Sequence, residues 1–295
     1  MAAISTTNLV LPKDVAKEIV TKAKNYSTIQ TLSAATPMLF KDITHMLFTT
    51  EPEAEFVAEG GQKNDATALI TPVPGEIHKA QVTVRLSDEV KWADEDGQLT
   101  IIEAIEDASA RAVGRALDYG VYHAINPRTG GVVSTMTALT TGVTAAGNDV
   151  TKTADALEDL DDLTAKVLDY EINGLALSRV WANELRKQRN DLGQRLFPEI
   201  PLSLNAGNVD GIPAATSNTV NGQLATTATG VLAILGNFDL IKWGIVRDLG
   251  LEIIETGDPD GLGDLKRYNQ IAYRTEIVYN WAVLDAAGFA VLRTA

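Results

Sequence analysis

The feature that most constrains the fold is one long amphipathic helix, predicted over residues 100 to 124. Thr100 and Glu103 form a capping box that marks its start. Its apolar stripe is predicted to consist of Ile101, Ile105, Ala108, Ala112 and Ala116. Such a helix would span roughly 35 Å at 1.5 Å per residue. A strut of this length with one charged face favours a plate-shaped building block over an enzyme.

The segment before this helix, residues 54 to 87, is predicted to be two strands that flank a long polar tip. Residues 81 to 87 alternate strictly, with Val82, Val84 and Leu86 on one face. Glycines and prolines between residues 60 and 75 interrupt regular structure and leave little apolar surface. Because an isolated two-stranded ribbon is marginal in water, we expect the hairpin to project and to contact another subunit or this subunit's body.

An N-terminal arm is predicted over residues 12 to 35, with Val15, Ile19, Val20 and Ala23 at helical spacing. The other face of this short helix is basic, with Lys13, Lys17, Lys22 and Lys24. Two interpretations of the basic face stay open: a solvated surface, or an arm that lies on an acidic neighbour.

The rest of the chain predicts an α+β fold, in which helices and strands are segregated. Residues 126 to 148 are predicted to be a connector rich in Gly, Thr and Ala. A helix follows over 153 to 170, with Ala156, Leu160, Leu163 and Val167 on one face. Further elements are a buried strand at 174 to 178, a helix at 180 to 190, and strands at 211 to 217, 231 to 238, 240 to 246, 251 to 256 and in the last 25 residues.

Composition excludes several classes of protein. Cysteine is absent, which excludes disulfides and thiolate chemistry. With 39 acidic and 25 basic residues the net charge is −14, so the overall field repels nucleic-acid backbones. No apolar run approaches the roughly 20 residues that span a bilayer, and we expect no membrane association.

No catalytic, cofactor-binding or metal site is predicted. His45, His78 and His123 lack metal-ligand spacing, and each is expected to be a surface or loop residue. The acidic face of Glu158, Asp161 and Asp162 is interpreted as solvated. The loop from residue 258 to 264 is interpreted as a hairpin turn and not a calcium loop, since Leu262 and Asn269 stand where ligands would be needed.

In their order along the chain, these segments resemble the major capsid proteins of tailed bacteriophages, which have the Hong Kong 97 (HK97)-like fold. The segments that resemble the family are YSTIQTLSA, AEFVAEGGQ, VTVRLSDEVKWAD, TIIEAIEDASARAVGRALDYGVYHAI, ALSRVWANELRKQRNDLGQRLF, VDGIPAATSNTV, ILGNFDLIKWGIVRDLGLEI and RYNQIAYRTEIVYNWAVLDAAGFAVLRTA. One small departure lies at the end, where Gly288 and Phe289 replace the family's Ala-Phe pair.

The resemblance implies an N-terminal arm and the start of a peripheral domain (1–53), an extended hairpin called the E-loop (54–87), and a peripheral domain with a spine helix (88–130). It further implies an axial domain (131–240), with residues 241–295 returning to the peripheral domain. The implied function is a head protein that assembles through hexamers and pentamers into an icosahedral shell around genomic DNA. Assembly would occur in the host cytoplasm, and the mature location would be the virion.

Seven charged residues of the arm and the E-loop region are expected at contacts between subunits. These are Lys13, Lys17, Lys22, Glu59, Lys63, Lys79 and Arg85. Implied partners are other copies of the chain, double-stranded DNA held without sequence-specific binding, and a portal protein. Because the sequence starts directly before the arm, a separate scaffolding protein is also expected. No lysine crosslink is assigned.

Alternative functions remain open at this point. A cellular nanocompartment (encapsulin-like) shell protein would share every feature above, and its packaged enzyme would distinguish it. A carboxylate-dependent hydrolase would need a cleft, and a tail component or adhesin would form small rings or fibres.

Overall fold

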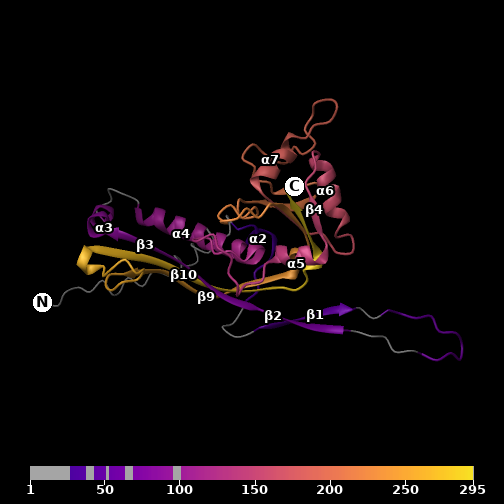
Figure 1. The fold of residues 1–295 in the computed structure, drawn as a ribbon, viewed down its shortest axis with the longest axis horizontal. Helices are drawn as coiled ribbons and strands as arrows, with labels where there is room; N and C mark the ends of the chain where they lie inside the picture. The colour runs from indigo at the N-terminus through magenta and orange to yellow at the C-terminus, as the bar shows by residue number, and fades with distance from the viewer. Residues whose placement is uncertain (1–26, 38–42, 51–52, 64–68, 96–100, 295) are drawn as a thin grey trace.

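The computed structural model describes residues 27–37, 43–50, 53–63, 69–95 and 101–294 (Figure 1). The helices are α2 (Thr28–Leu32), α3 (Asp88–Glu95), α4 (Ile101–Asp118), α5 (Leu139–Ala146), α6 (Ala156–Ala165) and α7 (Arg179–Lys187). The strands are β1 (Thr44–Thr50), β2 (Leu69–Pro74), β3 (Glu76–Ser87), β4 (Asp149–Thr151), β5 (Gly174–Leu177), β6 (Asn208–Val209), β7 (Ile212–Thr216), β8 (Val231–Gly236), β9 (Ile241–Ile254), β10 (Gln270–Val283) and β11 (Phe289–Arg293).

The long helix α4 lies along a three-stranded sheet of order β3-β10-β9 (Figure 1). It continues as a π-helical turn, Tyr119–His123, and ends at Ala124 in the left-handed region. The predicted long helix is therefore confirmed, although Thr100 of its expected cap lies outside the described residues.

The buried stripe of α4 differs from the predicted one. Ala110, Val113 and Leu117 are buried, whereas Ala108 is exposed. Ile105 is half-buried and packs against a cluster that includes the sheet residues Leu251, Ile271 and Tyr273, so its predicted packing on the sheet is confirmed. The face was misassigned because the helix is rich in alanine, which gives little contrast between its sides.

A six-stranded sheet of order β4-β11-β8-β5-β7-β6 forms a second lobe, flanked by α6 and α7 (Figure 1). Its central strands β8 and β5 are buried along their whole lengths. The predicted helix over 153 to 170 is shorter in the structure, where α6 ends at Ala165. Its predicted apolar face is confirmed: Ala156, Leu160 and Leu163 on α6 are buried, as is Val167 just after it. Strong apolar spacing against an acidic back makes such a face readable from sequence.

The hairpin is built from other strands than predicted. β1 pairs antiparallel with β2, whose partners run from Thr44↔Pro74 to Thr50↔Leu69. The alternating strand, β3, instead pairs with β10 in the three-stranded sheet. Gly75 lies between β2 and β3, where the chain leaves the hairpin and enters the three-stranded sheet. Its N–H donates to the carbonyl of Ile43 at 2.7 Å, and a Cβ there would lie 2.5 Å from Asn280 Oδ1. Alternation identifies a half-buried strand but not its partner.

Three further expectations need correction. Residues 139 to 146 of the expected connector form α5, and α7 ends at Lys187, before residue 190. The segments at 240–246 and 251–256 belong to one strand, β9, because a β-bulge at Leu249 and Gly250 absorbs the extra residue opposite Glu276. The expected N-terminal helix, with its basic face, lies outside the described residues. The domain boundaries stay a prediction.

Candidate assembly surfaces

The β1–β2 hairpin extends away from both lobes, on the side of the molecule opposite α3 (Figure 1). Its tip, residues 53–63, is exposed throughout, and Phe56 is fully exposed at 107% of its reference area. Met46 and Ile70 on the paired strands are also exposed, at 66% and 49%. Exposed apolar side chains in this number are typical of a surface that another molecule covers.

Two of the predicted contact residues, Glu59 and Lys63, lie on this tip and are exposed. Lys79 lies on β3 and forms an ion pair with Glu276 of β10. Lys13, Lys17 and Lys22 lie outside the described residues. The hairpin tip therefore brings together only Glu59 and Lys63, and contacts between subunits at all of these residues stay a prediction.

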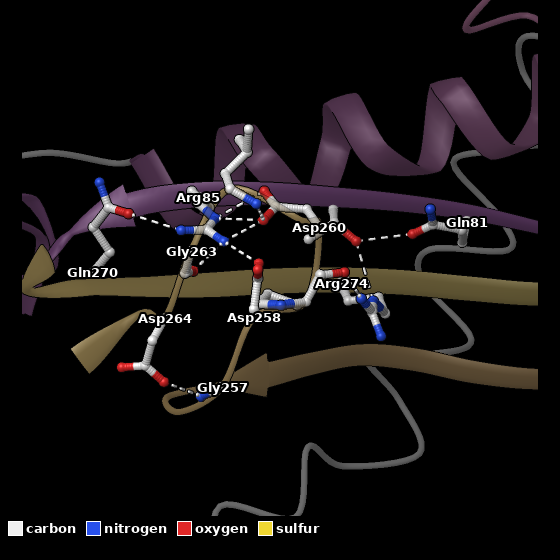
Figure 2. Close-up of polar contacts among 12 residues, drawn as sticks. Gln81, Arg85, Gly257, Asp258, Asp260, Gly263, Asp264, Gln270 and Arg274 are labelled. Carbon is white, nitrogen blue, oxygen red and sulfur yellow. Dashed lines mark hydrogen bonds and ion pairs between the residues drawn. The ribbon is translucent and has the colours of Figure 1, made fainter. Parts of the chain in front are cut away.

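Arg85, the seventh predicted contact residue, is occupied within its own subunit (Figure 2). Its Nε donates to both carboxylate oxygens of Asp260, at 2.7 and 2.8 Å. Its terminal nitrogens reach Asp258 at 2.9 Å, the carbonyl of Gly263 at 2.8 Å and Gln270 at 3.1 Å. The hydrogen bond from Arg85 lowers the pKa of Asp260 below its usual value.

This network fixes the loop between β9 and β10 onto the sheet. Arg274 adds a hydrogen bond to the carbonyl of Pro259 at 2.6 Å, and Leu265 in the same loop is fully buried. The predicted hairpin turn at residues 258 to 264 is confirmed. The partnership with Arg85 was not predictable from sequence, because the two sides lie 175 residues apart.

A second polar cluster joins the arm to α4. The carboxylate of Asp118, fully buried, accepts hydrogen bonds from Ser27 Oγ, the backbone N–H groups of Thr28 (2.9 Å) and Ile29 (3.3 Å), and Thr219 Oγ1 (2.6 Å). Burial raises the pKa of Asp118, and the hydrogen bonds from Ser27 and Thr219 oppose that shift. Asp118 thus ties the start of α2 and the loop at residue 219 to the end of α4. Its signal in the sequence is one acidic residue inside an otherwise apolar run.

The histidines are placed differently from the expectation of surface or loop positions. His123 is buried, and its Nε2 lies 3.1 and 3.0 Å from the carbonyl oxygens of Thr219 and Val220. Burial lowers the pKa of His123 to about 4. His45 and His78 are half-buried on strands, and His78 lies beside Trp281 and Glu76.

The acidic helix face is solvated, as predicted: Glu158, Asp161 and Asp162 are exposed on α6. Asp159 on the same helix is buried and accepts the N–H of Thr153 at 2.7 Å. Within the described ranges, no group of three His, Cys, Asp or Glu side chains is placed to hold a metal ion. None of the described helices has the length and apolar character that a membrane-spanning helix needs.

A long helix along a three-stranded sheet, a second sheet lobe and an extended hairpin together define a shell-building protein with the HK97-like capsid fold. The sequence profile of the phage capsid family matches residues 7–294. The chain therefore belongs to the phage capsid family: it is a major capsid protein that self-assembles into a shell and resides in the virion.

Solved structures agree with this assignment. A chain from Mycobacterium phage Ogopogo is 37% identical with a TM-score of 0.81, and the alignment covers 92% of each chain. A chain from Gordonia phage Cozz is 29% identical with a TM-score of 0.77, covering 92% of this chain and 87% of that one. The capsid of an empty GTA particle is 15% identical with a TM-score of 0.62, over 91% and 90% of the two chains, and shares the fold. No curated protein sequence matches significantly.

Proposed function

We propose that this chain forms the head shell of a tailed phage from hexameric and pentameric rings, and that the shell encloses double-stranded DNA without sequence-specific binding. The observation that most supports this function is the hairpin, whose tip is exposed from residue 53 to 63. A ribbon of this kind gains little stability from its own subunit, and neighbouring copies supply the missing contacts.

The charge of the subunit suits a container for DNA. The net charge of −14 repels phosphate backbones, so packaged DNA stays mobile and is not condensed onto the protein. Assembly takes place in the host cytoplasm with a separate scaffolding protein, and a portal protein occupies one vertex. The chain acts as a structural protein and not as an enzyme.

Shell assembly favours weak contacts that act together. Each subunit meets several neighbours, so modest contacts are multiplied by a high effective concentration. Contacts made by charged groups are screened by salt, because the Debye length falls from about 10 Å at 0.1 M to about 3 Å at 1 M. We therefore expect assembly to depend on both protein concentration and ionic strength.

The test is sedimentation and electron microscopy of the purified chain across a salt series, with and without a coexpressed scaffolding protein. Closed icosahedral particles are expected at moderate salt, with smaller species at high salt. If the protein stays monomeric under every condition, or forms only fibres, the proposed function is wrong. Nucleic acid extracted from native particles distinguishes a phage head from a nanocompartment, which would contain an enzyme.

A further inference from the structure

The hairpin tip has the chemistry of a ligand. Phe56 is fully exposed, and Glu53 and Glu59 are exposed on either side of it. Leaving a bulky aromatic side chain in water is unfavourable, and burying it in a recess of another molecule stabilises the complex. The carboxylates beside it make that binding selective for a recess with positive charge. The tip therefore calls for an acceptor with a recess and positive charge.

A groove with these properties lies between the two lobes. Its volume is about 800 Å³, and it is lined by the start of α2, by α4 and its π-helical turn, by β7 and by the loop at residues 205 to 207. Two guanidinium groups line it, those of Arg115 and Arg179. Tyr119 and Leu224 add apolar surface, and Asn218 and Gln223 add side-chain amides.

The electrostatic character of the groove is unusual for this chain. Among the described residues, none of those that line it is Asp or Glu, although the whole chain carries a net charge of −14. Arg115 is exposed, and neither it nor Arg179 forms an ion pair with a carboxylate of the described residues. Where the structure describes its partners, Arg179 donates to neutral oxygens, the carbonyl of Ser203 at 3.2 Å and the side chain of Asn205 at 3.4 Å. Both guanidinium groups are therefore able to receive a carboxylate.

A contact between the tip and the groove has to form between two copies of the chain. The paired strands β1 and β2 hold the tip away from the body, whereas α4 and β7 lie in the body (Figure 1). A donor surface and an acceptor surface on one chain, unable to meet within it, produce head-to-tail association, which closes into rings when the rotation allows.

We propose that the groove lined by Arg115 and Arg179 is the acceptor site for the hairpin tip of a second copy, with Phe56 inserted and Glu53 and Glu59 near the guanidinium groups. This inference rests on the proposed shell function and names the site at which one hairpin meets its neighbour. Opposite charges at the contact steer the tip and fix its register, and Phe56 provides buried apolar area.

Charge reversal in the full chain tests this pairing. Arg115→Glu with Arg179→Glu should prevent shell formation, as should Glu53→Lys with Glu59→Lys. A chain that carries all four changes restores complementarity and should form shells again. The matched control is Arg128→Glu with Arg267→Glu, which makes the same change in charge at two exposed arginines outside the groove and should assemble normally.

A binding measurement covers the case in which a reversed chain fails to fold. A labelled peptide of residues 51 to 63 is titrated into a subunit whose residues 51–68 are replaced by Asn-Gly. The milder pair Arg115→Gln and Arg179→Gln should weaken binding by at least about tenfold, and so should Phe56→Ser in the peptide.

These measurements distinguish failure of the tip–groove pairing from failure of the shell function. Two results would overturn the inference and leave the shell function intact. One is equal peptide binding with and without the Arg115→Gln and Arg179→Gln changes. The other is assembly of the Arg115→Glu and Arg179→Glu chain at wild-type yield. Failure of the wild-type chain to form shells under any condition would instead contradict the proposed function. Restored assembly in the four-change chain supports the pairing directly.

Discussion

Two extended segments of this molecule, the hairpin tip (53–63) and the β9–β10 loop (255–269), are held in different ways. The loop is fixed inside its own subunit by the Arg85 network and by the buried side chain of Leu265. Every residue of the tip is exposed, including its aromatic residue, Phe56. The loop is therefore part of the folded subunit, whereas the proposed function assigns the contacts of the tip to assembly.

The largest difference between body and tip is expected in the free energy of unfolding. Leu117→Ala removes a fully buried side chain of α4 and should cost about 2–5 kcal/mol. Phe56→Ala removes an exposed side chain and should change stability by less than about 0.5 kcal/mol. Urea unfolding of the unassembled subunits measures both values. Similar losses for the two variants would contradict the distinction between body and tip.

A pH dependence should arise in the body, at His123. Its pKa is lowered by burial from 6.5 to about 4, so below pH 6.5 the unfolded chain takes up a proton that the folded chain does not. Stability from this residue is fully present above pH 6.5 and is lost as the pH falls toward 4, by about 3 kcal/mol in total. Unfolding measured from pH 4 to 7 should show this slope in the wild type and a flatter one in His123→Gln. Parallel slopes would mean that His123 is not held neutral.

The smallest effect should be local, at the loop. Arg85→Ala removes the donor that binds Asp258, Asp260 and the carbonyl of Gly263, so residues 257 to 264 should be cleaved faster by proteases. Lys79→Ala is a matched control, because it removes an ion pair on the same strand without touching the loop. Limited proteolysis with mass spectrometry compares the two variants. If Arg85→Ala and Lys79→Ala are cleaved equally, Arg85 does not hold the loop.

Sequence reasoning succeeded where one local pattern determined the outcome. The α+β class, the length of the long helix and the buried face of α6 each follow from spacing within one segment. The family resemblance supplied the shell function, which the profile match confirms over residues 7–294.

The features that were missed depend on partners far away in the chain. Gln81 to Ser87 alternate correctly, but their partner strand, β10, starts at Gln270. Asp118 accepts hydrogen bonds from residues about 90 positions earlier and from Thr219, which lies 101 positions later. The bonds of Arg85 to Asp260 and Asp258 were missed because these carboxylates lie 175 and 173 residues further along the chain. A contact of Arg85 with another subunit stays a prediction. Local periodicity contains no information on such pairings.

The central claim, that the hairpin tip serves assembly and not folding, is tested most directly by replacing residues 51–68 with Asn-Gly. Thr50 and Leu69 are directly opposed, so a two-residue turn can close the ladder there. The account predicts a monomeric subunit with the melting temperature of the wild type and no shells in the electron microscope. A variant that unfolds, or one that still closes into shells, would contradict it.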